Sequence, residues 1–180
     1  MAKLTDMTTG SISKHLLAFA APLLLGNIVQ QFYNMVDSII VGNYVGQNAL
    51  AAVGTCGSMG FLFFSLSSGL AIGIGIIVSQ YFGAKDYQNV RTTIGSSLYV
   101  LSISAFIVTL IGVFLSPALL KLLQCPNTIF KDAVTYMRVT SLGIVFIALY
   151  NGVAAILRAL GDSKSPLYFL IISSIVNIAL

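Results

Sequence analysis

The sequence predicts an all-α membrane protein, a bundle of helices that crosses the bilayer several times. Hydrophobic residues make up 57% of the chain, charged residues only 8%, and the charges are separated by long apolar runs. An average soluble domain carries about 25% charged residues. So few charges cannot cover a water-facing surface, so most of the surface must face lipid. A soluble enzyme, a disordered tail and a coiled coil are therefore excluded.

Charge-free runs place the individual helices. A spanning helix needs about 20 apolar residues, so the run over 38–84 is too long for one helix. The stretch 42–48 within it is rich in glycine and asparagine, which is typical of a turn. Pro166 marks the start of the last helix, because proline is favoured in a first turn. The predicted helices are residues 16–41, 49–81, 92–115, 133–157 and 166–180.

Both ends of the sequence carry information about the membrane. Residues 1–15 read as a cytoplasmic N-terminal segment, and the apolar run that follows is too long for a cleavable signal peptide. The last helix stops at Leu180 inside an apolar segment, where terminal polar groups would lie in hydrocarbon. We therefore expect the sequence to be part of a longer protein.

Basic residues are distributed unevenly between the two sides of the predicted bundle. If the helices alternate in direction, the side of the N-terminus carries Lys3, Lys14, Lys85, Arg91, Arg158 and Lys164. The other side carries Lys121 and Lys131, with Arg138 slightly inside the fourth helix as a snorkelling residue. The positive-inside rule then places the N-terminus in the cytoplasm of a cell whose plasma membrane holds the protein.

A polar stripe runs along the first helix. Its members recur at steps of three and four residues, which places them on one helical face; they are Asn27, Gln30, Gln31, Asn34 and Asp37. A polar stripe on an otherwise apolar helix should face protein or a wet cavity rather than lipid.

Asp37 is the only carboxylate within any of the apolar runs. Burying its charge at membrane depth either costs free energy or leaves the group protonated. A carboxylate between these outcomes can bind and release a proton or a cation, as a coupled transporter requires. The alternative is that Asp37 lies at the outer interface and only solvates the end of the helix.

Other polar and small residues have structural explanations beside functional ones. Asn151 and Asn177 could each make an interhelical hydrogen bond of about 1 kcal/mol. Pro22 should bend the first helix, either for function or as an ordinary packing kink. Gly69 and Gly73 form a small-xxx-small pair, which favours close helix packing.

Catalytic and metal-binding patterns are missing from the sequence. It contains one His, no Glu, and two cysteines, Cys56 and Cys125, without metal-ligand spacing. No nucleophile–base pair or carboxylate pair is present. We therefore expect no enzyme activity and no cofactor.

Four stretches in this order resemble one family. They are PLLLGNIVQQFYNMVDSIIVG at 22–42, ALAAVG at 49–54, QYFGAKD at 80–86 and LRALGDSKSP at 157–166. Together they resemble the N-terminal part of a bacterial multidrug and toxic compound extrusion (MATE) transporter, from about Gly10 to Leu180. The resemblance implies five of the six helices of the N-terminal lobe, without the sixth helix and without the second lobe of such a twelve-helix protein.

The resemblance also implies function. MATE proteins expel small cationic drugs or metabolites in exchange for H⁺ or Na⁺. By this likeness Asp37 is the ion-coupling carboxylate, with Na⁺ as one candidate ion at Asp37 and Asn177. The implied cavity residues are Gln30, Tyr33, Asn34, Asn151 and Asn177. The implied partners are the drug, the lipid bilayer and the missing C-terminal lobe, with no nucleic acid.

Two other functions remain open at this point. A flippase for lipid-linked saccharides of the same superfamily would favour a cluster of Arg or Lys near its anionic headgroups, which the first two helices lack. A non-transporting membrane scaffold would let the polar stripe pack against another helix without a cavity. The transported substrate and the choice between H⁺ and Na⁺ also remain open.

Overall fold

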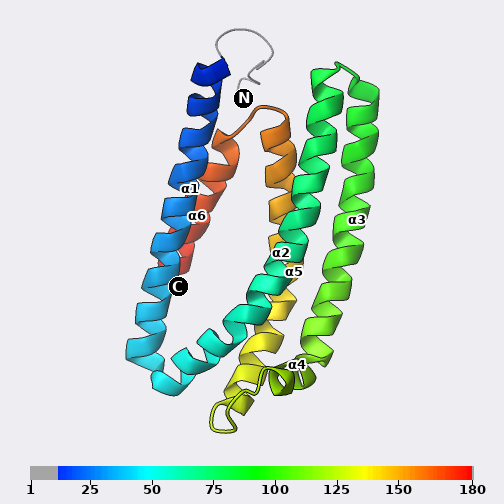
Figure 1. Cartoon of the computed structure of the whole chain (residues 1–180). Coiled ribbons are helices and arrows are strands. Elements are labelled where there is room, and N and C mark those ends of the chain that lie inside the picture. Colours follow the sequence, from blue (N-terminus) through cyan, green and yellow to red (C-terminus); the bar gives the residue numbers. More distant parts are fainter. Residues whose placement is uncertain (1–11, 180) are drawn as a thin grey trace.

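The computed structural model describes residues 12–179, which fold entirely into helices and short connections (Figure 1). The elements are α1 (Ile12–Ile40), η1 (Val41–Val45), α2 (Gln47–Gly83), α3 (Tyr87–Phe114), α4 (Ser116–Leu122), α5 (Phe130–Ala159) and α6 (Lys164–Ala179). The predicted all-α class is confirmed. Four segments have the length and hydropathy to cross a membrane: His15–Val45, Gln47–Gly83, Tyr87–Phe114 and Phe130–Ala159.

The helices extend further than the charge-free runs. α3 begins at Tyr87 rather than at residue 92, because Asp86 caps it and accepts a hydrogen bond from the backbone N–H of Asn89 at 3.1 Å. Charged side chains at a membrane surface can continue a helix, so a charge does not mark its end. The short helix α4, which has a proline in its first turn, was not predicted by the charge pattern.

The expected turn at 42–48 is mostly helical. Val41–Val45 continues α1 as a π-helical turn, in which the N–H of Gly46 donates to the carbonyl of Val41 at 3.2 Å. Only Gly46 separates this turn from α2. Its φ of +108° lies in the region that favours glycine.

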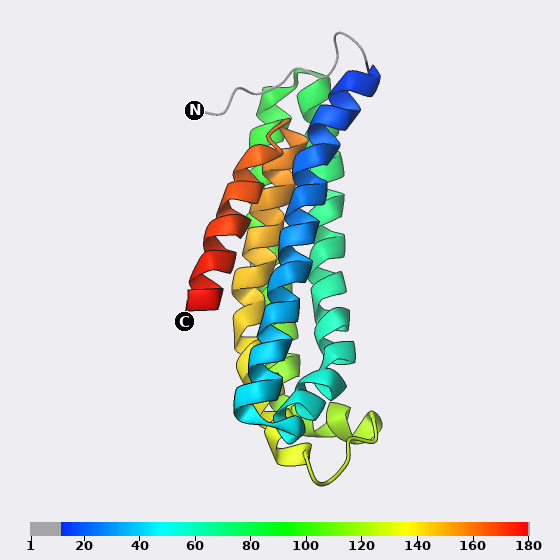
Figure 2. The same ribbon diagram turned by 90° about the vertical axis from the view of Figure 1, so that its left-hand side faces the viewer.

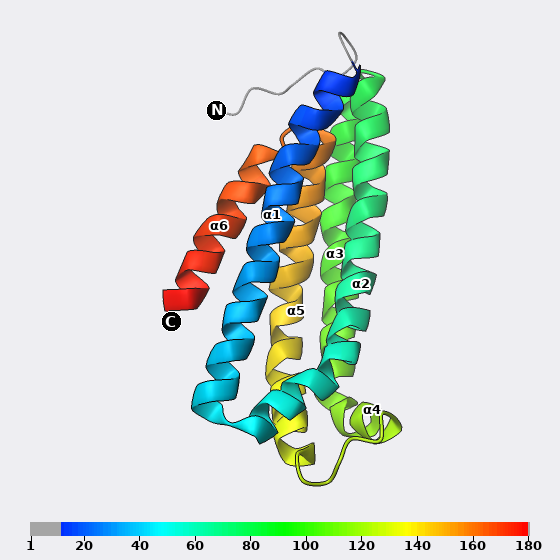
Figure 3. The same ribbon diagram turned by 60° about the vertical axis from the view of Figure 1, so that its left-hand side comes forward.

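The helices form two groups. α2, α3 and α5 pack against one another, whereas α1 packs mainly on α6 and on η1. Figure 3 shows α1 and α6 side by side, with α5 between them and the remaining long helices, and Figure 2 shows α6 and α2 at opposite edges of the bundle. We call α2, α3 and α5 the block and α1 and α6 the pair.

Glycine and small side chains bring the block together. A Cβ added to Gly112 would collide with the Ser141 side chain, and one added to Gly152 would collide with Leu101. Gly69 and Gly73 have no neighbour within 4 Å of such an atom. The predicted packing role of these two glycines is therefore wrong for the described helices.

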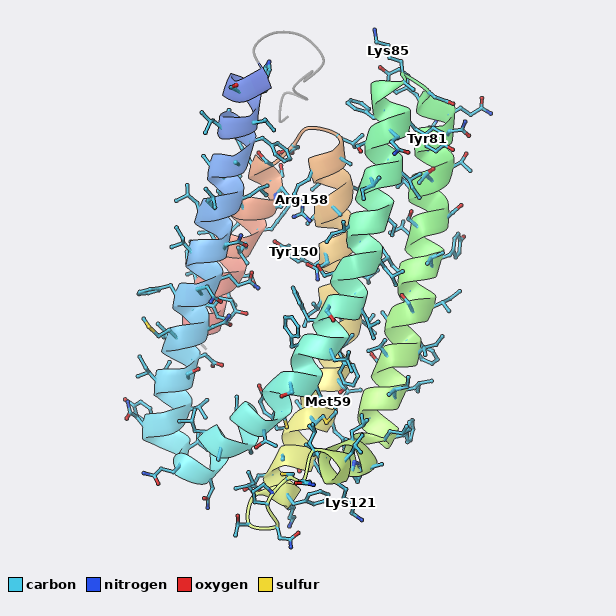
Figure 4. The ribbon with its side chains drawn as sticks, viewed as in Figure 1. Met59, Tyr81, Lys85, Lys121, Tyr150 and Arg158 are labelled. Atoms are coloured by element: carbon cyan, nitrogen blue, oxygen red, sulfur yellow. The ribbon has the colours of Figure 1, made fainter. Side chains whose placement is uncertain are left out.

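The basic residues are divided between the two ends of the bundle. The start of α1, the α2–α3 connection and the α5–α6 connection lie at the same end (Figure 1). This end holds Lys85, Arg91 and Lys164, with Arg158 in the last turn of α5. Lys121 lies at the opposite end (Figure 4), where α5 also begins with Lys131 and, two turns further along, carries Arg138. The alternation assumed in the charge comparison is thus present, whereas Lys3 lies outside the described residues.

Candidate functional site: a cavity between α1, α5 and α6

A cavity of about 620 Å³ lies between the pair and the block. Its walls come from α1, α5, α6 and the α5–α6 connection, with Phe64 contributed by α2. The polar lining residues are Asn27, Gln30, Tyr33, Tyr150, Asn151, Arg158, Ser163, Ser173 and Ser174. The apolar walls include Phe146, Leu167, Phe169 and Leu170. A mixed lining of this size suits a small organic molecule.

The α1 wall arises from residue spacing. Asn27, Gln30 and Tyr33 follow one another at steps of three and line the cavity together. Gly26, one turn above Gln30, is buried where α1 meets α6, and an added Cβ would lie 3.5 Å from Leu170. Such a distance is an ordinary van der Waals contact, so Gly26 marks where the two helices of the pair touch, one turn from the polar residues.

The α5 wall carries two polar groups one residue apart. The Tyr150 hydroxyl donates a hydrogen bond to the carbonyl of Pro166 at 3.1 Å, which joins α5 to the first turn of α6. The Nδ2 of Asn151 is buried and has no hydrogen-bond acceptor among the described residues. A buried amide donor without an acceptor is costly, so it marks a place where a ligand acceptor would be stabilised.

The α5–α6 connection is fixed by Asp162. Its carboxylate accepts hydrogen bonds from the backbone N–H groups of Lys164 and Ser165, both at 3.0 Å, and from the Ser165 hydroxyl. Burial acts to raise the pKa of Asp162, but these hydrogen bonds and the Lys164 charge outweigh it and lower the pKa below its usual value. The neighbouring Ser163 lines the cavity.

Asp37 lies outside this cavity. Its side chain is exposed in the described chain, three residues before the end of α1, and it is absent from the cavity lining. It lies within electrostatic range of two phenol groups, Tyr33 on its own helix and Tyr136 on α5. Since Tyr33 also lines the cavity, this tyrosine connects the carboxylate to the cavity wall.

The predicted residues are thus divided. Gln30, Tyr33 and Asn151 meet in the cavity. Asn34 is exposed outside it, and its amide donates to the side-chain oxygen of Gln31 at 3.4 Å. The side chain of Asn177 lies outside the described residues. Among residues 12–179, no group of three or more His, Cys or Asp side chains could hold a metal ion.

Sequence reasoning missed three kinds of residue. The aromatic walls Phe64, Phe146 and Phe169 carry no signal that distinguishes them from lipid-facing residues. Tyr136 is near Asp37 only through the fold. Arg158 was assigned to a loop by its charge, although its spacing of seven from Asn151 places both on one face of α5.

Arg138 has a structural role in the described chain. Its Nε donates to the carbonyl of Val113 at 3.2 Å and lies 3.3 Å from the Ser116 hydroxyl. The side chain is exposed, and these contacts join α5 to the end of α3 and the start of α4. A basic group near helix C-terminal carbonyls is favourable.

Comparisons with known proteins agree with this architecture. The sequence model of the MatE family matches residues 22–180. The chain is 34% identical to the "Probable multidrug resistance protein YpnP" of Bacillus subtilis (strain 168), over 99% of this chain and 40% of that protein. It is 31% identical to the "Probable multidrug resistance protein YoeA" of the same organism, over 94% of this chain and 37% of that protein.

A solved structure shares the fold. It is described as the "Outward-facing conformation of a multidrug resistance MATE family transporter of the MOP superfamily". It matches with a TM-score of 0.90 and 26% identity, over 99% of this chain and 39% of that one. The chain thus spans about 40% of the length of the proteins that it resembles.

Proposed function

The chain belongs to the MatE family, and we propose that it forms the first lobe of a secondary active efflux transporter. The relatives are multidrug transporters rather than enzymes, and the chain is a multi-pass membrane protein. The proposed activity is export of organic cations and drugs by antiport with H⁺ or Na⁺. The observation that carries it is the polar cavity between the pair and the block, lined by Gln30, Tyr33 and Asn151.

Asp37 is the proposed coupling group. Ionised, it attracts a cation; protonated or occupied by Na⁺, it loses its charge and the attraction. Tyr33 lines the cavity and interacts electrostatically with Asp37, so a change of charge at the carboxylate would alter the wall that a substrate touches. Such a change drives transport only if it favours one of two helix arrangements, as alternating access requires.

The proposed setting is a bacterial plasma membrane, with the N-terminus in the cytoplasm. The basic end of the bundle, with Lys85, Arg91 and Lys164, supports this orientation by the positive-inside rule. The proposed partners are the lipid bilayer and a second lobe, which would cover exposed apolar and polar surface on α1, Asp37 included.

The test is export by the complete gene product in cells that lack their own drug pumps. Asp37→Asn should reduce energy-dependent efflux of the fluorescent cation ethidium by at least about tenfold, because the amide cannot change its charge. Asp132→Asn is the matched control, since Asp132 is an exposed carboxylate in the first turn of α5 and should export normally. Unimpaired ethidium export by Asp37→Asn, at equal amounts in the membrane, would contradict the proposed coupling.

A further inference from the structure

The charge inside the cavity is positive. Among the described lining residues, Arg158 is the only charged side chain, and no carboxylate is among them. The guanidinium is partly buried, and no hydrogen bond or ion pair to another described residue satisfies it. A desolvated cation without a partner is costly, so this wall favours a negatively charged occupant.

Arg158 leans into the cavity rather than toward the membrane surface. Side chains on an α-helix tilt toward its N-terminus, and the N-terminal direction of α5 leads from Arg158 past Asn151 and Tyr150. Arg158 and Tyr150 lie close enough to interact electrostatically. Figure 4 shows both labelled side chains on the side of α5 that faces α1 and α6. Snorkelling to the lipid surface would require the opposite direction.

A second donor faces the same space. The buried Nδ2 of Asn151 has no acceptor, and it stands two turns, about 10 Å, from Arg158 along the same face of α5. Two unsatisfied donors on one wall select a ligand with acceptor oxygens. A guanidinium in particular binds carboxylate and phosphate groups through paired hydrogen bonds.

We infer that the α5 wall of the cavity is a binding site for an organic oxyanion, in which Arg158 binds a carboxylate or phosphate group and Asn151 supplies a further donor. The body of the ligand packs on the aromatic walls Phe64, Phe146 and Phe169. The oxyanion belongs either to a soluble amphiphile or to an anionic lipid headgroup. The site shares the cavity and Asn151 with the proposed transport function, so a transported cation that fits both would also carry an oxyanion, as a zwitterion does. The inference concerns binding alone, and its test does not depend on ion coupling.

The soluble arm of the test uses 1-naphthyl phosphate as the probe. The complete gene product is placed in nanodiscs of phosphatidylcholine, and binding is measured by equilibrium dialysis with empty discs as the blank. Arg158→Gln should weaken binding at least about tenfold, which corresponds to about 1.4 kcal/mol. Arg158→Lys should weaken it less, because the charge remains and the planar fork is lost. Asn151→Ala should weaken it a few-fold.

Arg91→Gln is the matched control, since Arg91 is an exposed arginine at the same end of the bundle and does not line the cavity. It should bind the probe as the natural sequence does. Equal thermal unfolding of the variants shows that a loss of binding is not a loss of folding.

The lipid arm uses discs that also contain phosphatidylglycerol. Native mass spectrometry after detergent extraction measures how much of this lipid the protein retains. If the lipid is retained by the natural sequence and by Arg91→Gln but lost from Arg158→Gln, the oxyanion is a lipid headgroup. Probe binding without such retention identifies a soluble ligand. The inference is overturned if Arg158→Gln binds the probe and the lipid as tightly as the natural sequence does. It is also overturned if the natural sequence binds neither of them, which is the result expected where a carboxylate outside residues 12–179 neutralises Arg158.

Discussion

The block and the pair differ in how they are held. In the most apolar window of α5, 39% of the residues are buried, against 6% for the first span. α5 is enclosed by α2 and α3, whereas α1 has α6 and η1 as its main contacts. The block therefore carries its own stability, while the pair is held by a few contacts and by whatever covers it in the membrane. The cavity lies along this division, so its polar walls belong to two parts that can move separately.

Breaking the block should have the largest effect. Gly152→Ala places a Cβ in collision with Leu101, a fully buried side chain, and should lower the free energy of unfolding by about 1–3 kcal/mol. Gly73→Ala is the matched control, since its Cβ would meet open space and alanine is the better helix former. The buried thiols of Cys56 and Cys125 allow the measurement, through a dye that fluoresces on reaction with exposed cysteine during heating. Equal melting of the two variants would contradict a close approach at Gly152.

The cap on α6 should have a smaller effect, because it joins the pair to the block through one short connection. Asp162→Ala removes the acceptor of two backbone hydrogen bonds and should cost about 0.5–2 kcal/mol. It should also raise amide hydrogen exchange in the first turn of α6 but not in α3, which has its own cap at Asp86. Faster exchange in both helices would indicate general unfolding instead.

The lowered pKa of Asp162 predicts that the stability of the protein depends on pH. Because the folded-state pKa of Asp162 is lowered, its contribution is complete above the unfolded pKa of about 4 and is lost as the pH falls through the lowered folded value. Asp162→Asn keeps a capping residue but cannot titrate. Its melting temperature should therefore fall less than that of the natural sequence between pH 5 and pH 3. An identical acid-induced fall would mean that other carboxylates control it.

The tie between Tyr150 and Pro166 should have the smallest effect. Tyr150→Phe removes one hydrogen bond at 3.1 Å and should lower stability by about 0.5–1.5 kcal/mol. The loss should be confined to the pair, so amide exchange should rise in α6 while α2 is unchanged. Tyr136→Phe is the control, since that hydroxyl makes no hydrogen bond to the described residues. If both variants leave α6 equally protected, the tie does not hold the pair.

The sequence predicted what depends on composition and period. Charge-free runs predicted the long helices, and the polar stripe predicted that Asn27 and Gln30 share one wall, whereas Tyr33 was assigned to the cavity only by the family resemblance. The spacing alone could not show that Asp37 lies away from that wall. Steps of three and four residues only approximate the helical repeat, so the last members of a long stripe face a different direction from the first. The role predicted for Asp37 stays a prediction. Arg158 was missed because counting loop charges ignores the direction in which a long side chain leans.

Gly46 sets how α1 can be displaced. A single non-helical residue joins the end of η1 to α2, so the C-terminal end of α1 is tethered to the block over almost no distance. A rigid helix that is fixed at one end is displaced most at its other end, which for α1 is the N-terminal end. Any rotation of α1 about Gly46 would therefore open a gap that widens with distance from Gly46, toward Ser163 and the last turn of α5. A longer connection at Gly46 would remove this constraint and let both ends of α1 move.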